Sequence, residues 1–105
     1  MDEKLKGLLG LCARAGKLSA GHDCVRDSLR RRRSKLVILT SDASQRLKDE
    51  TVRAAGRVPT VTADFESGDC LAAFSKKVCV MSVDDGNFAA GILRRFGEIN
   101  SKRPE

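Results

Sequence analysis

Apolar residues in the first segment of the chain recur at the spacing of one helical face. They occupy positions i, i+3, i+4 and i+7: Leu5, Leu8, Leu9 and Cys12. This spacing predicts an amphipathic helix over residues 3–15, which Gly16 ends. After a loop over residues 16–21, a second helix is expected, with Ser28 and Leu29 on its inner face beside either Cys24 or Val25.

The middle of the chain alternates short apolar runs with helical spacing. Residues 36–39 form a continuous apolar run followed by turn formers, which predicts a strand covered on both faces. A helix is expected from about Ser44 to Gly56. Residues 58–61 form a weaker strand, and the proline within it favours an edge position.

The last part of the chain repeats this order. Ser67 is expected to cap a short helix with Cys70, Leu71 and Phe74 facing inward, and residues 78–83 predict a strand. Asp84 or Asp85 then caps a final helix. Its inner face carries apolar residues at helical spacing: Phe88, Ala89, Ile92, Leu93 and Phe96.

Strands that alternate with helices indicate crossover connections between parallel strands. We therefore expect one domain over residues 1–105, folded as a three-layer α/β/α sandwich with a small, mostly parallel central sheet. No linker or internal repeat divides the chain. The polar tail over residues 100–105 is predicted to be frayed.

Composition narrows the class of protein. The 105 residues are 41% hydrophobic and 32% charged, which is typical of a globular domain. Apolar runs such as residues 36–39 are far shorter than the roughly 20 residues of a membrane span, and no secretion signal is visible at the start. Four scattered cysteines without a C-x-x-C pair favour reduced thiols, a cytoplasmic location and no zinc site.

Charge indicates the class of partner. The net charge of +6 is concentrated in residues 1–34, which carry nine basic and four acidic groups. A polyanion is the natural partner of such a surface. The strongest basic feature is Arg30 to Arg33 with Lys35, for which a solvated helix end is the competing interpretation.

Three motifs that resemble catalytic or metal sites favour simpler explanations. Gly16 and Gly21 have the spacing of a phosphate-binding loop that holds ATP, but the lysine and hydroxyl of that motif are missing. His22 and Cys24 lie two positions apart, so they do not face each other on a helix. Asp84 and Asp85 could bind Mg²⁺, although helix capping accounts for them more simply. We expect no enzyme activity, metal or cofactor.

Together, four segments resemble a known family. They are residues 8–17 (LLGLCARAGK), Gly21 with Val25, residues 35–44 (KLVILTSDAS) and residues 83–89 (VDDGNFA). In this order they resemble the bacterial YlxQ-type branch of the ribosomal kink-turn RNA-binding family, the L-seven-Ae family. The resemblance runs over about residues 4–96.

The resemblance implies an α/β/α fold that binds structured, possibly kink-turn, RNA without catalysis. Readers of kink-turns use the start of the second helix, after the equivalent of Gly21. The amide, carboxylate and lysine of the best binders fall here on Asp23, Cys24 and Asp27. A second RNA-contacting loop of the family maps to residues 74–78, which contain Lys76 and Lys77.

The resulting hypothesis is a ribosome-associated or RNA-metabolism accessory protein whose partner is ribosomal or other non-coding RNA. The sequence predicts neither a membrane partner nor an oligomeric state. The candidate RNA-binding residues are Lys17, Gly21, His22, Asp23, Cys24, Arg26, Arg30, Arg31, Arg32, Arg33, Lys35, Lys76 and Lys77. The alternative is a protein-interaction module that kept the fold and lost specific RNA recognition. Asp23, Cys24 and Asp27 motivate this alternative, because they depart from the residues of the best kink-turn binders; a charge at Asp27 and a thiol at Cys24 do not replace the usual RNA contacts.

Overall fold

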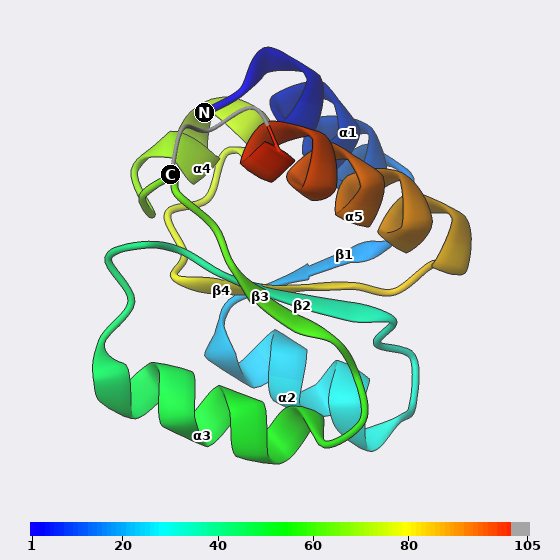
Figure 1. Cartoon of the computed structure of the whole chain (residues 1–105). Coiled ribbons are helices and arrows are strands. Elements are labelled where there is room, and N and C mark those ends of the chain that lie inside the picture. Colours follow the sequence, from blue (N-terminus) through cyan, green and yellow to red (C-terminus); the bar gives the residue numbers. More distant parts are fainter. Residues whose placement is uncertain (102–105) are drawn as a thin grey trace.

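The computed structural model describes the backbone of residues 1–101 and the side chains of residues 1–99 (Figure 1). Helices and strands alternate along this part of the chain. The elements are α1 (Glu3–Arg14), β1 (Leu18–Ala20), α2 (His22–Arg30), β2 (Leu36–Leu39), α3 (Gln45–Ala55), β3 (Thr60–Thr62), α4 (Asp69–Phe74), β4 (Val80–Val83) and α5 (Gly86–Ser101). The predicted helices and the strands at residues 36–39, 58–61 and 78–83 are all present, with shifted ends. The predicted frayed tail falls largely outside the described residues, and α5 extends to Ser101.

The four strands form one mixed sheet in the order β1-β4-β2-β3. β2 and β3 are parallel, whereas β4 is antiparallel to both of its neighbours, β1 and β2. Three strands therefore run one way, and β4 runs back between two of them. β3 lies at the edge, as its proline predicted.

The prediction of a mostly parallel sheet is therefore wrong. The sequence analysis treated residues 16–21 as a loop and missed β1, which has three residues. A strand so short carries little alternation, and its pairing with β4 is a contact across more than 60 residues. The direction of β4 likewise depends on its distant partners.

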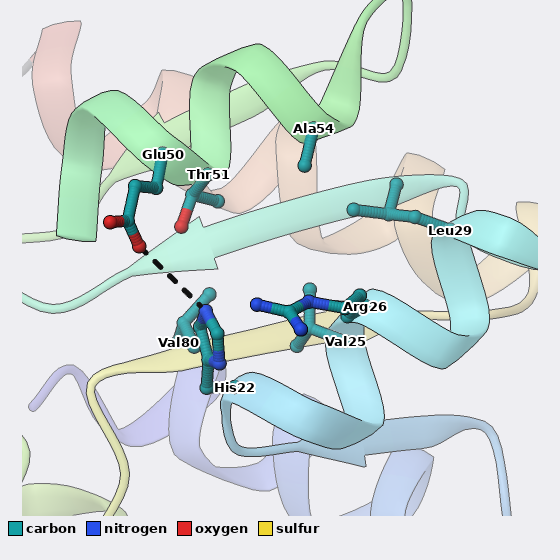
Figure 2. A pocket seen from close by; sticks show the side chains of 8 residues that line it. All are labelled: His22, Val25, Arg26, Leu29, Glu50, Thr51, Ala54 and Val80. Carbon is teal, nitrogen blue, oxygen red and sulfur yellow. Dashed lines mark ion pairs between the residues drawn. The ribbon is translucent and has the colours of Figure 1, made fainter.

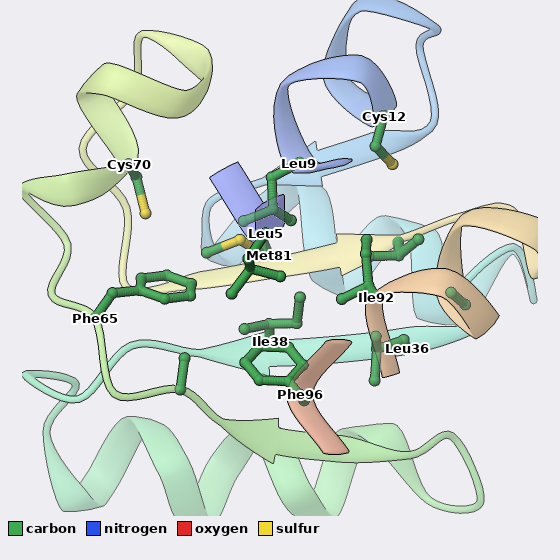
Figure 3. Close-up of a cluster of buried hydrophobic side chains, with 13 residues drawn as sticks. Leu5, Leu9, Cys12, Leu36, Ile38, Phe65, Cys70, Met81, Ile92 and Phe96 are labelled. Atoms are coloured by element: carbon green, nitrogen blue, oxygen red, sulfur yellow. The ribbon is translucent and has the colours of Figure 1, made fainter. Parts of the chain in front are cut away.

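Helices lie on both faces of the sheet: α1, α4 and α5 on one, and α2 and α3 on the other (Figure 1). Two buried clusters follow this arrangement. The larger joins Leu9, Met81 and Ile92 from α1, β4 and α5 (Figure 3). The smaller joins Val25 of α2 to Val37 of β2, with Ala55 of α3. β2 is buried on both faces, as its continuous apolar run predicted.

Capping side chains set the helix starts. The Asp2 carboxylate accepts a hydrogen bond from the Leu5 backbone N–H, and the Ser44 hydroxyl accepts one from Leu47. Ser67 does not cap α4, because its hydroxyl donates instead to Asp42. Leu71 does not face inward either: it is 53% exposed, since a helix of six residues buries one narrow side.

No helix among residues 1–101 combines the length and apolar character needed to cross a membrane.

Candidate nucleic-acid interface

The start of α2 leaves backbone donors available to a ligand. Gly21 has φ 99°, a conformation that favours glycine, and its N–H donates to the carbonyl of Val80 at 2.9 Å. Among the described residues, no side chain caps this helix. The first N–H groups of a helix point outward at its positive pole, which is a favourable place for phosphate oxygens.

The loop between α4 and β4 lies beside Gly21. A Cβ added to Gly21 would stand 3.9 Å from a methyl group of Val78. The loop starts at Ser75, which has φ 64° and ends α4. Exposed Lys76 and Lys77 follow. The fold therefore brings these two lysines, 55 or more positions away in sequence, to the end of the sheet where α2 begins.

Carboxylates also lie at this end. Nδ1 of His22 is 3.7 Å from Asp23, and Nε2 is 4.0 Å from Glu50 of α3. The side chain of Asp23 is 99% exposed, and Cys24 is also exposed. Val25, rather than Cys24, faces the core. The start of α2 thus offers two acidic groups and one imidazole beside its backbone donors.

A groove of about 200 Å³ runs between α2 and α3, next to His22 (Figure 2). The side chains that line it are His22, Val25, Arg26, Leu29, Glu50, Thr51, Ala54 and Val80. Arg26 and the His22–Glu50 pair form its polar part, and aliphatic side chains form its floor. Arg26, a predicted contact residue, therefore faces this groove rather than the lysine loop.

The far end of α2 closes in a tight turn. After Arg30, the N–H of Arg32 donates to Leu29 and the N–H of Arg33 donates to Ser28, a Schellman arrangement. Arg32 adopts φ 60°, which is uncommon for a residue with a side chain. The predicted basic run therefore forms the last turn of a helix and a bend that follows it.

A network of hydroxyl groups lies under this turn. Both carboxylate oxygens of Asp84 accept hydrogen bonds: Ser28 and Ser82 donate to Oδ1, each at 2.6 Å, and Ser19 donates to Oδ2. The hydroxyls of Ser82 and Ser34 lie 2.7 Å apart. Asp84 therefore links β1, α2 and β4 directly, and it is connected to the turn through Ser82 and Ser34. Asp85, not Asp84, caps α5 by accepting from the N–H of Phe88.

Two of the four arginines are partly neutralised. Asp27 pairs with Arg30 at 3.0 Å and with Arg31 at 3.1 Å. The hydrogen bond from Arg30 holds the pKa of Asp27 below its ordinary value. Within the described part of the chain, no ion pair involves Arg32 or Arg33, and Asp27 thus serves the arginine run rather than a separate contact.

Lys17 and Lys35 lie at the same end as the arginine turn. The N–H of Lys35 donates to Val83, and the carbonyl of Lys17 accepts from Asp84, so both residues extend the sheet ladder beside β4. Both side chains are exposed.

Apart from Arg26, which lines the groove, the predicted contact residues separate into two surfaces. The first is the amino-end surface: Gly21, His22, Asp23, Cys24, Lys76 and Lys77. The second is the arginine-turn surface: Lys17, Arg30, Arg31, Arg32, Arg33 and Lys35. Along the axis of α2, about 12 Å separate the backbones of His22 and Arg30, and about 9 Å separate those of Cys24 and Arg30. The sequence predicted Gly21 before the second helix and Arg30 to Arg33 at its end, but the sequence analysis treated them as one site. The Ser19–Ser28–Asp84 network was missed because its members come from three distant segments.

The buried thiols are poor nucleophiles. Burial raises the pKa of both Cys12 and Cys70 to about 11, above the ordinary value of 9.0. Among the residues whose placement is described, no group of three or more His, Cys, Asp or Glu side chains could hold a metal ion.

Of the comparisons with known proteins, the one with solved structures supports the fold. No protein-family model matches the sequence, and no curated protein matches it significantly. Two solved structures are similar. A protein of unknown function from Bacillus halodurans is 27% identical, with a TM-score of 0.80, over 89% of this chain and 96% of that one. The 15.5kD RNA binding protein of Giardia lamblia is 21% identical, with a TM-score of 0.66, over 93% of this chain and 92% of that one. This chain thus shares its fold with an RNA-binding protein.

Proposed function

We propose that this protein binds structured RNA through the amino-end surface and performs no catalysis. The observation that carries the proposal is the meeting of the uncapped start of α2 with Lys76 and Lys77 at one end of the sheet. Backbone N–H groups at a helix start can fix the register of a phosphate, and lysines supply the long-range attraction.

The position of this surface in the fold supports the proposal. β1, β2 and β3 all end on the side where α2 begins, since β4 alone of the sheet runs the other way. Ligands of open α/β sheets commonly bind outside the carboxyl ends of the strands. The likeness to the Giardia RNA-binding protein along most of the chain is consistent with this assignment.

The finer part of the proposal is that the RNA contains a kink-turn and belongs to the ribosome or another non-coding RNA, as the resemblance to the L-seven-Ae family implies. Asp23 and Cys24 replace the side chains that read bases in the best kink-turn binders. Asp27 holds Arg30 and Arg31 instead of meeting phosphate. We therefore expect recognition of RNA shape and backbone to dominate over base reading.

The test is a binding panel of a kink-turn RNA, a plain RNA duplex and a DNA duplex, each at two salt concentrations. We expect preference for the kink-turn RNA to persist at the higher salt. Lys76→Ser/Lys77→Ser should weaken binding to every RNA and lower the slope of log affinity against log salt by about 2.

A matched control removes the same charge elsewhere. Lys4 of α1 and Arg94 of α5 are exposed and belong to helices on the face of the sheet opposite to α2. Lys4→Ser/Arg94→Ser should leave affinity close to that of the unaltered protein. Equal effects of the two double variants would show that net charge, not the amino-end surface, governs binding.

The groove between α2 and α3 favours the alternative function, a protein-interaction module. Its floor is aliphatic, and Arg26 and Glu50 at its polar side could fix a peptide. Absence of RNA binding across the whole panel, together with a stoichiometric protein partner that survives nuclease treatment, would favour this second function.

A further inference from the structure

The turns after α1 and α2 have the same hydrogen bonds but different residues at the strained position. In α1, the N–H groups of Gly16 and Lys17 donate to Ala13 and Cys12. The turn after α2 repeats this pattern, with Arg32 in place of Gly16. The φ angles are 73° at Gly16 and 60° at Arg32. Glycine adopts this conformation freely, whereas an arginine does so against its preference.

The arginine turn is held firmly despite this strain. Ser34 is 6% exposed, and its hydroxyl lies 2.7 Å from that of Ser82. The N–H of the next residue, Lys35, donates to the carbonyl of Val83 at 2.8 Å. Together with the N–H groups of Arg32 and Arg33, which donate to Leu29 and Ser28, these contacts fix the backbone before and after Arg33. A frayed helix end would need neither the buried serine nor the left-handed residue.

The charges at this end favour an anionic partner. Six basic side chains form the arginine-turn surface. The three carboxylates near them are all engaged: Asp27 with Arg30 and Arg31, Asp84 with serine hydroxyls, and Asp85 with the start of α5. Arg32, Arg33 and Lys35 are exposed, and none of them forms an ion pair with another described residue. Lys17 and Lys35 lie on either side of the β4 strand, and two strand spacings place their backbones about 10 Å apart.

We propose that the arginine-turn surface is a second phosphate-binding surface, so that one chain holds two separate RNA segments, one at each end of α2. This inference rests on the proposed function for the identity of the partner. Strain that the surrounding structure maintains is a known mark of functional positions. Here it keeps a guanidinium, a group suited to phosphate, where the same turn elsewhere in the chain has glycine.

The test uses two short RNA duplexes, one carrying a donor fluorophore and the other an acceptor. The full chain is added below the RNA concentration. We expect energy transfer between the duplexes, because each bridging chain brings one of each together. Arg32→Ser/Arg33→Ser/Lys35→Ser should abolish transfer while the chain still binds one duplex, and the salt slope of total binding should fall by about 3.

Two further variants locate the bridge. Lys76→Ser/Lys77→Ser should also abolish transfer, because it removes the other surface. Lys4→Ser/Lys6→Ser/Arg94→Ser removes the same charge as the triple variant from the opposite face and should leave transfer unchanged. Circular dichroism of each variant checks that the fold is intact.

Mixing separates bridging by one chain from bridging by a pair of chains. The triple variant and the lysine-loop variant each retain one surface. If each chain bridges by itself, their mixture gives no transfer. Restored transfer in the mixture would show that two associated chains make the bridge, which would overturn the inference.

The remaining outcomes are also distinct. One duplex bound with no transfer, or transfer that survives the triple variant, would overturn the second surface and leave the proposed function intact. No RNA bound by the unaltered chain would overturn the proposed function itself. Binding of an acidic peptide under those conditions, lost in the triple variant, would assign the arginine turn to a protein partner.

Discussion

Each end of α2 is flanked by a residue with a positive φ angle, but the residue type differs between the two ends. Gly21 precedes the helix with φ 99°, and Arg32 follows it with φ 60°. The first position holds the residue that fits its conformation, and the second holds one that does not. At the start, the backbone itself is exposed to a ligand; at the end, a side chain is displayed by a constrained backbone. The contrast indicates recognition through N–H groups at one end and through guanidinium groups at the other.

The surroundings of the two ends differ as well. The start of α2 has no capping side chain within the described residues, and it lies among half-exposed His22 and Glu50. The end rests on the buried network of Ser28, Ser82 and Asp84. Stability should therefore be concentrated under the arginine turn, and adaptability around Gly21.

The largest expected effect comes from the network under the turn. Asp84→Ala removes the acceptor of three serine hydroxyls, of which Ser82 and Ser28 are 0% and 3% exposed. Unpaired buried hydroxyls should lower the free energy of unfolding by about 3 kcal/mol, measured by urea denaturation. Asp85→Ala, which removes the cap of α5, should cost about 1 kcal/mol. Equal losses would contradict a special role for Asp84.

The next effect concerns the start of α2. Gly21→Ala has room for its methyl group, since the nearest atom is 3.9 Å away. The cost is conformational, because φ 99° with ψ 159° suits glycine, and we expect a loss of about 2 kcal/mol in thermal or urea unfolding. Gly7→Ala, inside α1 with open space around it, should stabilise by up to about 1 kcal/mol. A neutral Gly21→Ala would disprove the strain.

The third effect has the opposite sign. Arg32→Gly relieves the left-handed conformation and should raise the free energy of unfolding by about 0.5–1 kcal/mol, while it weakens RNA bridging. Arg31→Gly is the matched control, because Arg31 has φ −84° and pairs with Asp27, so it should destabilise. Calorimetry and the energy-transfer assay measure the two properties. A less stable Arg32→Gly would remove the argument that strain is retained for function.

The smallest effect is a pH dependence at the end where α2 begins. The hydroxyl and N–H of Ser67 donate to Asp42 at 2.6 and 2.9 Å, and these bonds lower the pKa of Asp42 to about 2 from 3.8. Because the folded pKa is the lower one, the ionised carboxylate stabilises the fold above about pH 4. This contribution disappears as the pH falls toward 2.

The measurement compares urea unfolding of the unaltered protein and Asp42→Asn from neutral to acid pH. The difference between them should shrink below about pH 4. Asp23→Asn is the control for the loss of one surface carboxylate, because the Asp23 side chain is 99% exposed. A constant difference across the range would show that the Asp42 charge plays no part.

Local pattern was sufficient for most elements. The apolar spacing in α1 and α5, the solid apolar run of β2 and the proline before β3 each predicted an element that the structure contains. The prediction failed where an element owes its existence to a distant partner. β1 was missed, and Ser67 was assigned to a cap although it meets Asp42 instead.

The sequence by itself determined the helices and the buried strand, because each depends on the spacing of residues close in the chain. It also determined the basic first third of the chain and the resemblance to an RNA-binding family, because charge and motif order need no folded structure. Only the tertiary structure decided the direction of β4, the Asp84 network and the position of the lysine loop beside Gly21. These features arise from pairings between segments tens of residues apart. The separation of Gly21 from Arg32 is local by contrast, because one helix of nine residues lies between them, whereas the lysine loop reaches Gly21 only in the folded chain.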